Sequence, residues 1–297
     1  MNSAGDSGQR IERIPDPWHR VDASGEADRL IQILKESGSS AQMAELRRQW
    51  LNFAGVRSGQ HVLDVGCGTG VVARDLVERV GERGKVVGID PSERLIEVAV
   101  RRMEEGGLRG RIEFRAADGA ALPFPDGSFD LVVASAVFGH IPNGLQVLVE
   151  MVRVTRSGGT VVVFDHDIDT IIVSADDRDL TRRIVHAYCD RYFTSGWSGR
   201  ELYGLFRQAA LDEIRVLPLT DISTELGAYW ERMVERLSRV AVETSVVSDK
   251  EAEAWRSDLE RKGREGRFFA SRSYFCLRGR KPPSPSSSPP QGRGGTP

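Results

Sequence analysis

Short apolar segments alternate with amphipathic ones between residues 60 and 167, and this alternation constrains the fold more than any other feature of the chain. Five apolar, β-branched runs have the length of buried strands. They cover residues 61–65, 85–90, 112–117, 131–136 and 160–164. The helix-like segments between them, which repeat apolar residues on one face, lie at 71–80, 92–105 and 143–155. Apolar strands connected by such helices predict a parallel sheet that is covered by helices on both faces.

The rest of the chain predicts more helices and two more strands. Helical periodicity marks residues 24–55, 177–193 and 199–210, and an apolar stripe runs from Leu226 to Ala241. Ser248-Asp-Lys-Glu251 has the form of a capping box, which predicts a further helix. Strand-like runs cover 213–221 and 268–277. We therefore predict an α/β fold, a Rossmann-like, seven-stranded, mostly parallel sheet with helices on both faces and a helical lid.

The domain assignment follows from these elements. We assign residues 21–280 to a single domain with a core at 60–167, helical lid or substrate elements at 21–59 and 168–265, and a last strand at 266–278. The polar residues 1–20 are predicted to form a flexible N-terminal arm. Six of the 13 prolines lie between Pro282 and Pro297. We therefore predict that residues 281–297 form a disordered Pro/Ser-rich tail.

Charge and cysteine content exclude several classes of function. The chain has 41 Lys plus Arg and 43 Asp plus Glu, so its net charge of −2 gives no field for a nucleic-acid partner. Its three cysteines, Cys67, Cys189 and Cys276, fit neither a disulfide framework nor a zinc site, which favours a reducing cytoplasm. The chain shows neither an apolar run as long as a membrane span nor the apolar core of a signal peptide. We expect a cytoplasmic monomer or homodimer with no nucleic-acid or membrane partner.

A glycine-rich turn follows the first strand and opens the first helix of the sheet region. It reads Asp64-Val-Gly66-Cys67-Gly68-Thr-Gly70. Glycines at alternate positions let the backbone turn sharply and approach a ligand with no side chain in between. The pattern differs from the dinucleotide motif G-x-G-x-x-G, and the chain has no G-x-x-x-x-G-K-S/T loop for a nucleoside triphosphate.

Acidic residues end the next two strands. Asp90 ends the second strand, 20 residues after Gly70, and Asp118 follows the third. In nucleotide-binding α/β sheets an acid after the second strand accepts hydrogen bonds from ribose hydroxyls, and the ligand lies at the carboxyl ends of the strands. The glycine turn, Asp90 and Asp118 therefore predict one crevice that binds a nucleoside.

The region from about Gln60 to Phe164 resembles the class I S-adenosylmethionine-dependent methyltransferases. The segments that carry the resemblance are Asp64-x-Gly66-x-Gly68-x-Gly70, Gly88-Ile-Asp90-Pro91-Ser, Ala117-Asp118-Gly119, the run from Leu122 to Asp130, and Arg156-Ser-Gly158-Gly159. Within the class, the chain looks like the bacterial branch that contains ubiquinone and menaquinone C-methyltransferases and many natural-product methyltransferases. The segments around Asp167, Gly196 and Gly266 resemble small-molecule members of that branch.

The resemblance implies S-adenosylmethionine as cofactor and a role for each matching residue. Gly66 and Gly68 would line the methionine end, and Asp90 would hold the ribose diol. Asp118 would accept from the adenine amino group, with the backbone of Gly119 donating nearby. Ser135 and Ala136, at the end of the fourth strand, would border the methyl-transfer centre. The other cofactor-site candidates are Asp64, Cys67, Gly70 and Pro91.

Methyl transfer from a sulfonium is an in-line displacement that requires alignment, a dry pocket and, for some nucleophiles, a base. His140 follows the fourth strand and is a candidate base or substrate contact, with a turn-capping histidine as the alternative. Asp165 follows the fifth strand and is a candidate substrate contact, whereas Asp167 is predicted to lie in a charged turn. These acids and His166 are metal-ligand types, but a metal-dependent branch also needs an acid where this chain has Ser135, so we expect no metal.

Five aromatic residues are candidates for a substrate lid, with ordinary packing as the alternative for at least three of them. They are Trp18, Phe138, Tyr188, Tyr192 and Trp197. The leading hypothesis is an enzyme of class EC 2.1.1.- that methylates an O, N or C atom of a natural-product or quinone-like small molecule. One alternative is an RNA or protein methyltransferase, which the lack of a basic stripe disfavours. Another is an enzyme that binds the cofactor without methyl transfer.

Overall fold

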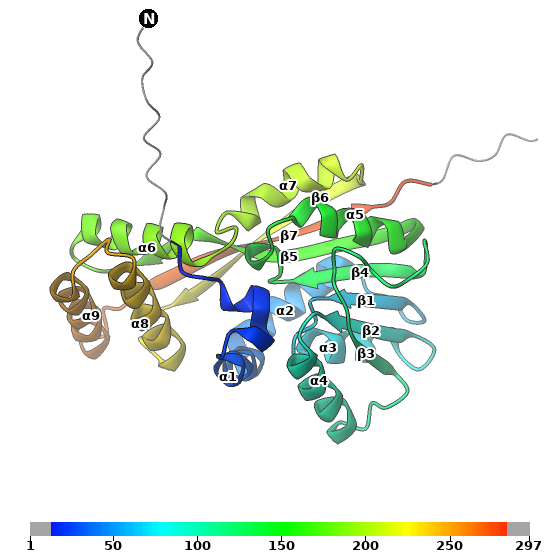
Figure 1. Ribbon diagram of the computed structural model, residues 1–297, viewed down its shortest axis with the longest axis horizontal. Coiled ribbons are helices and arrows are strands. Elements are labelled where there is room, and N and C mark those ends of the chain that lie inside the picture. Colours follow the sequence, from blue (N-terminus) through cyan, green and yellow to red (C-terminus); the bar gives the residue numbers. More distant parts are fainter. Residues whose placement is uncertain (1–12, 284–297) are drawn as a thin grey trace, which may run out of the picture.

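The computed structural model describes residues 13–283, which form a seven-stranded sheet between layers of helices (Figure 1). The strands are β1 (His61–Val65), β2 (Lys85–Asp90), β3 (Ile112–Ala116), β4 (Phe129–Ser135), β5 (Thr155–Val173), β6 (Asp212–Ser223) and β7 (Ala270–Arg280). Their order across the sheet is β3-β2-β1-β4-β5-β7-β6. Strands β1 to β5 are parallel, and β7 is antiparallel to both β5 and β6. The predicted fold class is confirmed.

The helices begin and end close to the predicted limits. They are α1 (Ala27–Ser39), α2 (Ala41–Ala54), α3 (Val71–Val80), α4 (Glu93–Glu105), α5 (Gly144–Val154), α6 (Arg178–Tyr192), α7 (Ser198–Gln208), α8 (Ala228–Glu243) and α9 (Asp249–Arg264), with short 3-10 helices η1 (Pro17–Ala23) and η2 (Phe138–His140). The Ser92 side chain accepts a hydrogen bond from the backbone of Leu95 and caps α4. Ser248 and Glu251 form the predicted capping box of α9.

Two apolar layers enclose the parallel part of the sheet. On one face, residues of α2 and α3, such as Trp50 and Leu76, pack with the buried side of the strands. On the opposite face, α5 and α7 contribute Leu148 and Phe206 to a second core. Burial of both sheet faces explains why the parallel strands read as nearly continuous apolar runs.

A third core lies where β5, β6 and β7 extend beyond the parallel strands. There α6, α8 and α9 pack together at one end of the molecule, on the left of Figure 1. Trp230 and Leu237 of α8 and Trp255 of α9 are buried in this core. The apolar stripe on α8 is therefore core packing, and the same helix borders the cavity described below.

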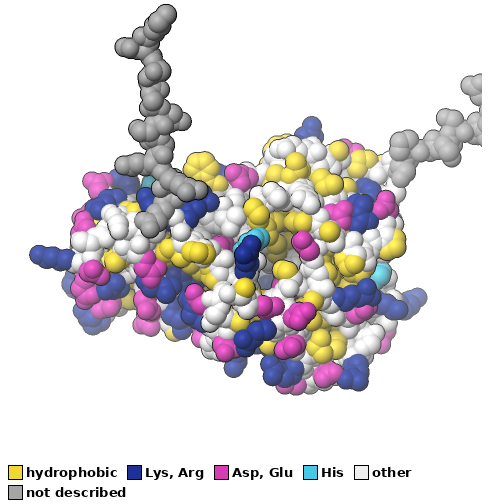
Figure 2. Space-filling view, in the orientation of Figure 1, with side chains coloured by type: hydrophobic (Ala, Val, Ile, Leu, Met, Phe, Trp, Pro, Cys, Tyr) yellow, Lys and Arg dark blue, Asp and Glu magenta, His cyan; other side chains and the backbone are white. Residues whose placement is uncertain are grey.

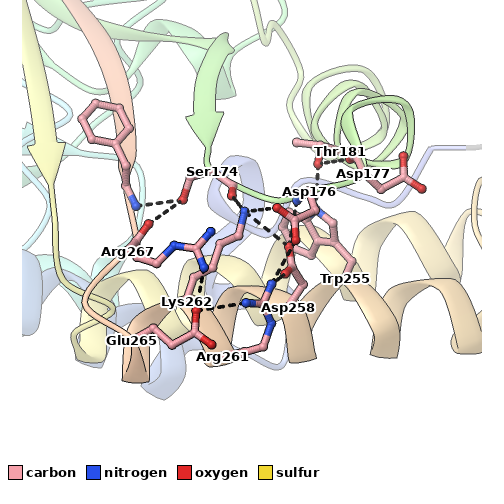
Figure 3. Close-up of polar contacts among 11 residues, drawn as sticks. Ser174, Asp176, Asp177, Thr181, Trp255, Asp258, Arg261, Lys262, Glu265 and Arg267 are labelled. Atoms are coloured by element: carbon pink, nitrogen blue, oxygen red, sulfur yellow. Dashed lines mark hydrogen bonds and ion pairs between the residues drawn. The ribbon is translucent and has the colours of Figure 1, made fainter.

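A polar network ties α9 to the end of β5 and the start of α6 (Figure 3). The buried Lys262 ammonium bonds to the Ser174 carbonyl and forms an ion pair with Asp176 at 2.6 Å. The indole nitrogen of Trp255 donates to the Thr181 hydroxyl at 3.0 Å. These bonds satisfy a buried cation and fix the third core to the sheet.

Strand β5 differs from its prediction. It was expected to end at Phe164, with Asp167 in a charged turn, but the strand continues to Val173 and Asp167 is buried inside it. The turn prediction was wrong because Arg200 of α7 binds the Asp167 carboxylate at 2.6 Å. An acid can be buried in a strand when a distant element supplies its counter-charge.

The described part of the predicted N-terminal arm is also packed. Pro17 of η1 is buried, and the side chain of Asp16 caps this helix by accepting from the backbone of Trp18. Residues 1–12 and 284–297, which carry the rest of that arm and most of the predicted Pro/Ser-rich tail, lie outside the described residues. None of the helices between residues 13 and 283 has both the length and the apolar character needed to cross a membrane.

Candidate active site

A cavity of about 350 Å³ lies at the carboxyl ends of β1, β2 and β4. The turns after these strands form one side, and residues of η1, α1, α2, α6, α8 and β7 form the rest of its wall. Figure 2 shows hydrophobic side chains grouped in the middle of this face, with charged side chains mostly around them. The cavity is therefore covered by segments that come from both ends of the described chain.

The glycine turn after β1 has a backbone that side chains would obstruct. Gly66 has φ +70°, and a Cβ added there would lie 2.4 Å from Cγ2 of Val137, which also lines the cavity. Gly68 has φ +52° and Gly70 has φ +75°, and Gly70 begins α3. Gly66 and Gly68 line the cavity, whereas Gly70 packs against Phe114. The positive φ angles explain the need for glycine at all three positions.

Cys67 lies inside this turn and also lines the cavity. Its backbone N–H donates to the Ile89 carbonyl at 2.8 Å, which ties the turn to β2. Burial raises the pKa of the Cys67 thiol well above its usual value, and the charges of Asp64 and Asp90 add to this rise. The side chain is therefore a neutral thiol that packs as a small apolar group.

Asp90 organises the turn from the end of β2. One carboxylate oxygen accepts from the Gly68 N–H at 2.9 Å and the other accepts from the Ser92 N–H at 3.0 Å. Both Asp90 and the following Pro91 line the cavity. Each carboxylate oxygen accepts more than one hydrogen bond, so Asp90 retains acceptor capacity toward a ligand hydroxyl.

Asp64, at the end of β1, has an unusual environment. Its side chain is buried, and neither carboxyl oxygen has a hydrogen-bond partner of ordinary geometry within residues 13–283. Burial, followed by the charge of Asp90, raises the pKa of Asp64 to about 8. A buried carboxyl group without a partner at a cavity wall is suited to a ligand that carries positive charge.

The other predicted cofactor residues divide into two groups. Ser135 and Ala136 line the cavity at the end of β4, and Ala136 has φ +55°, which is strained for a residue with a side chain. Asp118 and Gly119 lie after β3 and do not line this cavity. Asp118 is exposed and accepts from the Ala120 N–H at 2.8 Å. The assignment of Asp118 and Gly119 to adenine stays a prediction.

His140 lines the cavity and forms a pair with Asp16. Nδ1 of His140 lies 2.8 Å from Oδ2 of Asp16, and the two side chains are only 13% and 4% exposed. The Trp18 and Phe193 rings lie beside the imidazole, with ring centroids 5.8 and 5.0 Å away. Sequence reasoning missed Asp16 because it was assigned to a flexible arm. The signal that identifies it is Asp16-Pro17, an N-cap acid followed by proline at the first helical position.

Asp165 and the residues after it face different partners. Asp165 is fully buried, and its carboxylate accepts from the backbone N–H groups of Phe138 at 2.7 Å and His166 at 2.8 Å. It does not line the cavity, so its contact with substrate remains only a prediction. Asp167 faces Arg200, and His166 faces the cavity. Within residues 13–283 no group of three or more metal-ligand side chains is arranged to hold a metal ion.

Two of the five predicted lid aromatics line the cavity, and these are Trp18 and Tyr188. Phe138 and Tyr192 are buried in the cores, and Trp197 is 48% exposed beneath the guanidinium of Arg200. The structure adds cavity residues that sequence reasoning missed. They are Arg232 and Arg236 of α8, and Arg272 and Tyr274 of β7.

These features fit S-adenosylmethionine, which carries a sulfonium and an ammonium group. Asp64 offers a carboxyl group with no partner of its own to such a cation. The turn at Gly66 brings backbone to the cavity where a Cβ would collide with Val137. Asp90 lies next to this turn with acceptor capacity for a diol. The glycine–acid crevice therefore has the donor and acceptor types that this cofactor requires.

Comparisons with known proteins find methyltransferases. Demethylmenaquinone methyltransferase of Bacillus cereus is 29% identical over 188 residues, which is 59% of this chain and 79% of that protein. Methyltransferase GfsG of Streptomyces halstedii is 35% identical over 171 residues, or 57% of this chain. The chain spans less than two thirds of the length of GfsG, 58%. The crystal structure of YcgJ from Bacillus subtilis has the same fold, with a TM-score of 0.57 and 17% identity over 80% of this chain and 98% of that one.

Residues 56–209 match the family described as "Methyltransferase domain". The matched segment contains the glycine turn, Asp90, the end of β4 and His140. It covers more than half of the chain, and the strand order and the glycine–acid crevice are those of the same fold. The chain belongs to the class I S-adenosylmethionine-dependent methyltransferases.

Proposed function

We propose that this chain transfers the methyl group of S-adenosylmethionine to an O, N or C nucleophile of a natural-product or quinone-like small molecule. The observation that carries the proposal is that one covered cavity of about 350 Å³ contains both the glycine–acid crevice and His140. A cavity of this size is typical of a small-molecule site and supports a small acceptor over an RNA or a folded protein. The similarity to demethylmenaquinone methyltransferase supports a compact, cyclic acceptor.

The cofactor side of the cavity is built by the strand ends. Gly66 and Gly68 present backbone to the ligand, Asp90 accepts from ribose hydroxyls, and Asp64 faces positive charge. When bound, S-adenosylmethionine supplies an activated methyl group on a sulfonium. Because the methyl donor is already activated, the task of the protein is to align the acceptor and to exclude water.

His140 holds or moves the proton of the acceptor. With the proton on Nδ1, the imidazole donates to Asp16 at 2.8 Å, and the lone pair of Nε2 is then available to take a proton from an acceptor O–H or N–H. Asp16 is a positioning residue that fixes the ring and the tautomer, since it is buried and touches the substrate side only through His140. Trp18 and Phe193 pack beside the ring and keep water from the pair.

Calorimetry and turnover test the proposal separately. We expect purified protein to bind S-adenosylhomocysteine with one site per chain, and Asp90→Ala to weaken this binding at least about tenfold because it removes two turn hydrogen bonds and a diol acceptor. Incubation with S-adenosylmethionine and a panel of phenols and hydroquinones, followed by mass spectrometry, should detect an acceptor heavier by one methylene group. Binding with no methylation of any acceptor in such panels would contradict the proposal and favour a non-methylating enzyme.

A further inference from the structure

The cavity wall opposite the glycine turn carries arginine and tyrosine side chains. Arg236 and Tyr229 come from α8, Tyr188 comes from α6, and Arg272 and Tyr274 come from β7. These five residues, which we call the arginine–tyrosine wall, line the same cavity as the glycine turn but come from elements outside the cofactor motif. Tyr188 was predicted as a lid aromatic, but neither the sequence motifs nor the methyl-transfer proposal assigns the other four a role.

Arg272 is held rigidly within this wall. Its guanidinium is buried, donates to the phenol oxygens of Tyr229 and Tyr274, and lies over the Tyr274 ring at 4.7 Å. Its Nε has no hydrogen-bond partner within the described chain. The carboxylate of Asp221 lies 4.0 Å away and provides a partial counter-charge.

Arg236 has no such counter-charge. Among residues 13–283 no carboxylate forms an ion pair with it. Its guanidinium has a hydrogen bond to Tyr188, and the phenols of Tyr192 and Tyr229 lie nearby. Burial raises the pKa of Tyr192 to about 12, and it also raises the pKa of Tyr229. These two phenols therefore stay protonated and supply no negative charge. Arg232, one turn earlier on α8, shows the contrast because it pairs with Glu36 at 2.6 Å.

His166 adds a neutral polar group at the same cavity. Its side chain is buried, and Nε2 has no hydrogen-bond partner within residues 13–283. Burial, aided by the nearby charges of Arg272 and His140, holds the pKa of His166 well below its usual range. The imidazole is therefore uncharged and does not compete with Arg236 for an anion.

We propose that the acceptor is an acidic small molecule whose carboxylate binds Arg236, with the hydroxyls of Tyr188 and Tyr229 as further donors. A guanidinium that lines a cavity and has only phenol neighbours is free to pair with an anion from a ligand, and its planar set of N–H donors matches a carboxylate. The arginine–tyrosine wall thus gives charge complementarity at one end of the cavity, while the acids of the glycine side give it at the other. This inference rests on the proposed function for the identity of the cavity as an acceptor site.

The test uses matched pairs of acids and amides on the full chain saturated with S-adenosylhomocysteine. The probes are benzoate, salicylate, 4-hydroxybenzoate and cinnamate, each compared with its carboxamide by calorimetry. We expect at least one acid to bind wild-type protein about tenfold or more tightly than its amide. Arg236→Gln should reduce this preference about tenfold, and Arg236→Lys should retain part of it.

Arg239→Gln is the matched control, since Arg239 lies on the exposed side of the same helix and does not line the cavity. It should keep the full preference for acids. Equal binding of acids and amides, no binding of any acid at about 10 mM (a dissociation constant of 1 mM corresponds to only about −4 kcal/mol), or an unchanged preference in Arg236→Gln would each overturn the inference.

These outcomes are distinguishable from failure of the proposed function. Loss of S-adenosylhomocysteine binding would be seen before any acid is added, and it would contradict the methyl-transfer proposal. Tight binding of an acid with no methylation would refute methyl transfer while leaving the anion site in place.

Discussion

Replacing Gly66 by alanine tests two separate constraints that require glycine at this position of the turn. The first is the backbone, because φ is +70° and a Cβ in this region costs about 1–2 kcal/mol. The second is space, because the new Cβ would lie 2.4 Å from Cγ2 of Val137. To reach an ordinary contact of 3.4 Å, Val137 must move by about 1 Å, and overpacking of this kind costs about 1–3 kcal/mol. We therefore expect Gly66→Ala to lower the free energy of unfolding by about 2–5 kcal/mol.

Gly59 provides the matched control within the same chain. Its φ is +84°, but a Cβ there would meet nothing within 4 Å, so Gly59→Ala should cost only the backbone part, about 1–2 kcal/mol. Urea unfolding of the two variants measures the difference, which isolates the contact with Val137. The double variant Gly66→Ala/Val137→Ala lacks this contact. A double-mutant cycle of the two substitutions should therefore give a favourable coupling free energy of about 1–3 kcal/mol.

The same variants separate stability from cofactor binding. Val137 and Gly66 both line the cavity, so a shift at their contact moves the turn that faces the cofactor. We expect Gly66→Ala to weaken S-adenosylhomocysteine binding at least about tenfold, and Gly59→Ala to leave it unchanged. The reasoning is refuted if the two alanine variants are equally stable, or if the Val137→Ala cycle shows no coupling.

Three other predictions concern charged groups. Asp16→Asn should lower kcat about 10- to 100-fold with little change in KM, because the carboxylate that positions His140 is lost. Asp16→Glu should recover part of the activity. An equal loss of kcat in the Glu and Asn variants would mean that the carboxylate does not position His140. The raised pKa of Asp64, about 8, means that the folded protein holds a proton that the unfolded chain releases near pH 4, so the free energy of unfolding should fall as pH rises from 4 to 8. Asp64→Asn should flatten this dependence in urea titrations at pH 5 and pH 8, and a wild-type slope that persists in the variant would exclude Asp64 as its source. Lys262→Met should lower the free energy of unfolding by about 1–3 kcal/mol because it breaks the buried contacts of α9, whereas Lys250→Met on the exposed start of that helix should have no effect.

The sheet and its helices were predictable because their signal is local. In residues 60–167 each strand is a short apolar run and each helix has one apolar face, so periodicity alone indicates both the elements and their order. Helix α3 begins at Val71 and ends at Val80, as predicted, since Gly70 and Gly81 mark its two ends in the sequence. The parallel arrangement followed because apolar strands joined by helices have few other ways to bury both sheet faces.

The end of β5 was not predictable for the opposite reason. Asp165, His166 and Asp167 form a polar run that ordinarily ends a strand, but all three are buried, and the two acids have partners far along the chain. Asp165 accepts from the backbone after β4, and Asp167 pairs with Arg200 of α7. Nothing near these residues in sequence indicates such partners.

Local sequence likewise identifies some residues of the site and not others. The glycine turn and Asp90 lie in a motif, so local sequence identified them. Arg236 lies among exposed charges of an amphipathic helix, where an arginine is normally solvated, and only tertiary packing shows that it borders a cavity. Asp16 lies 124 residues from His140, and its role depends on η1 folding onto the site.

The charge distribution of the cavity relates its acidic and basic residues to one another. Asp64 on the glycine side and Arg236 on the arginine–tyrosine wall are both held without a partner of opposite charge among the described residues. Asp64 destabilises the ligand-free protein, because a buried polar group without a partner loses its hydration and gains nothing in return. Arg236 has a hydrogen bond to Tyr188 and lacks only a counter-ion. Retention of two such groups at opposite ends of one cavity is explained if a cation and an anion bind there together. It follows that Asp64→Asn should stabilise the free protein and weaken binding of the cofactor, whereas Arg236→Met should weaken binding of the acidic acceptor and leave cofactor binding unchanged.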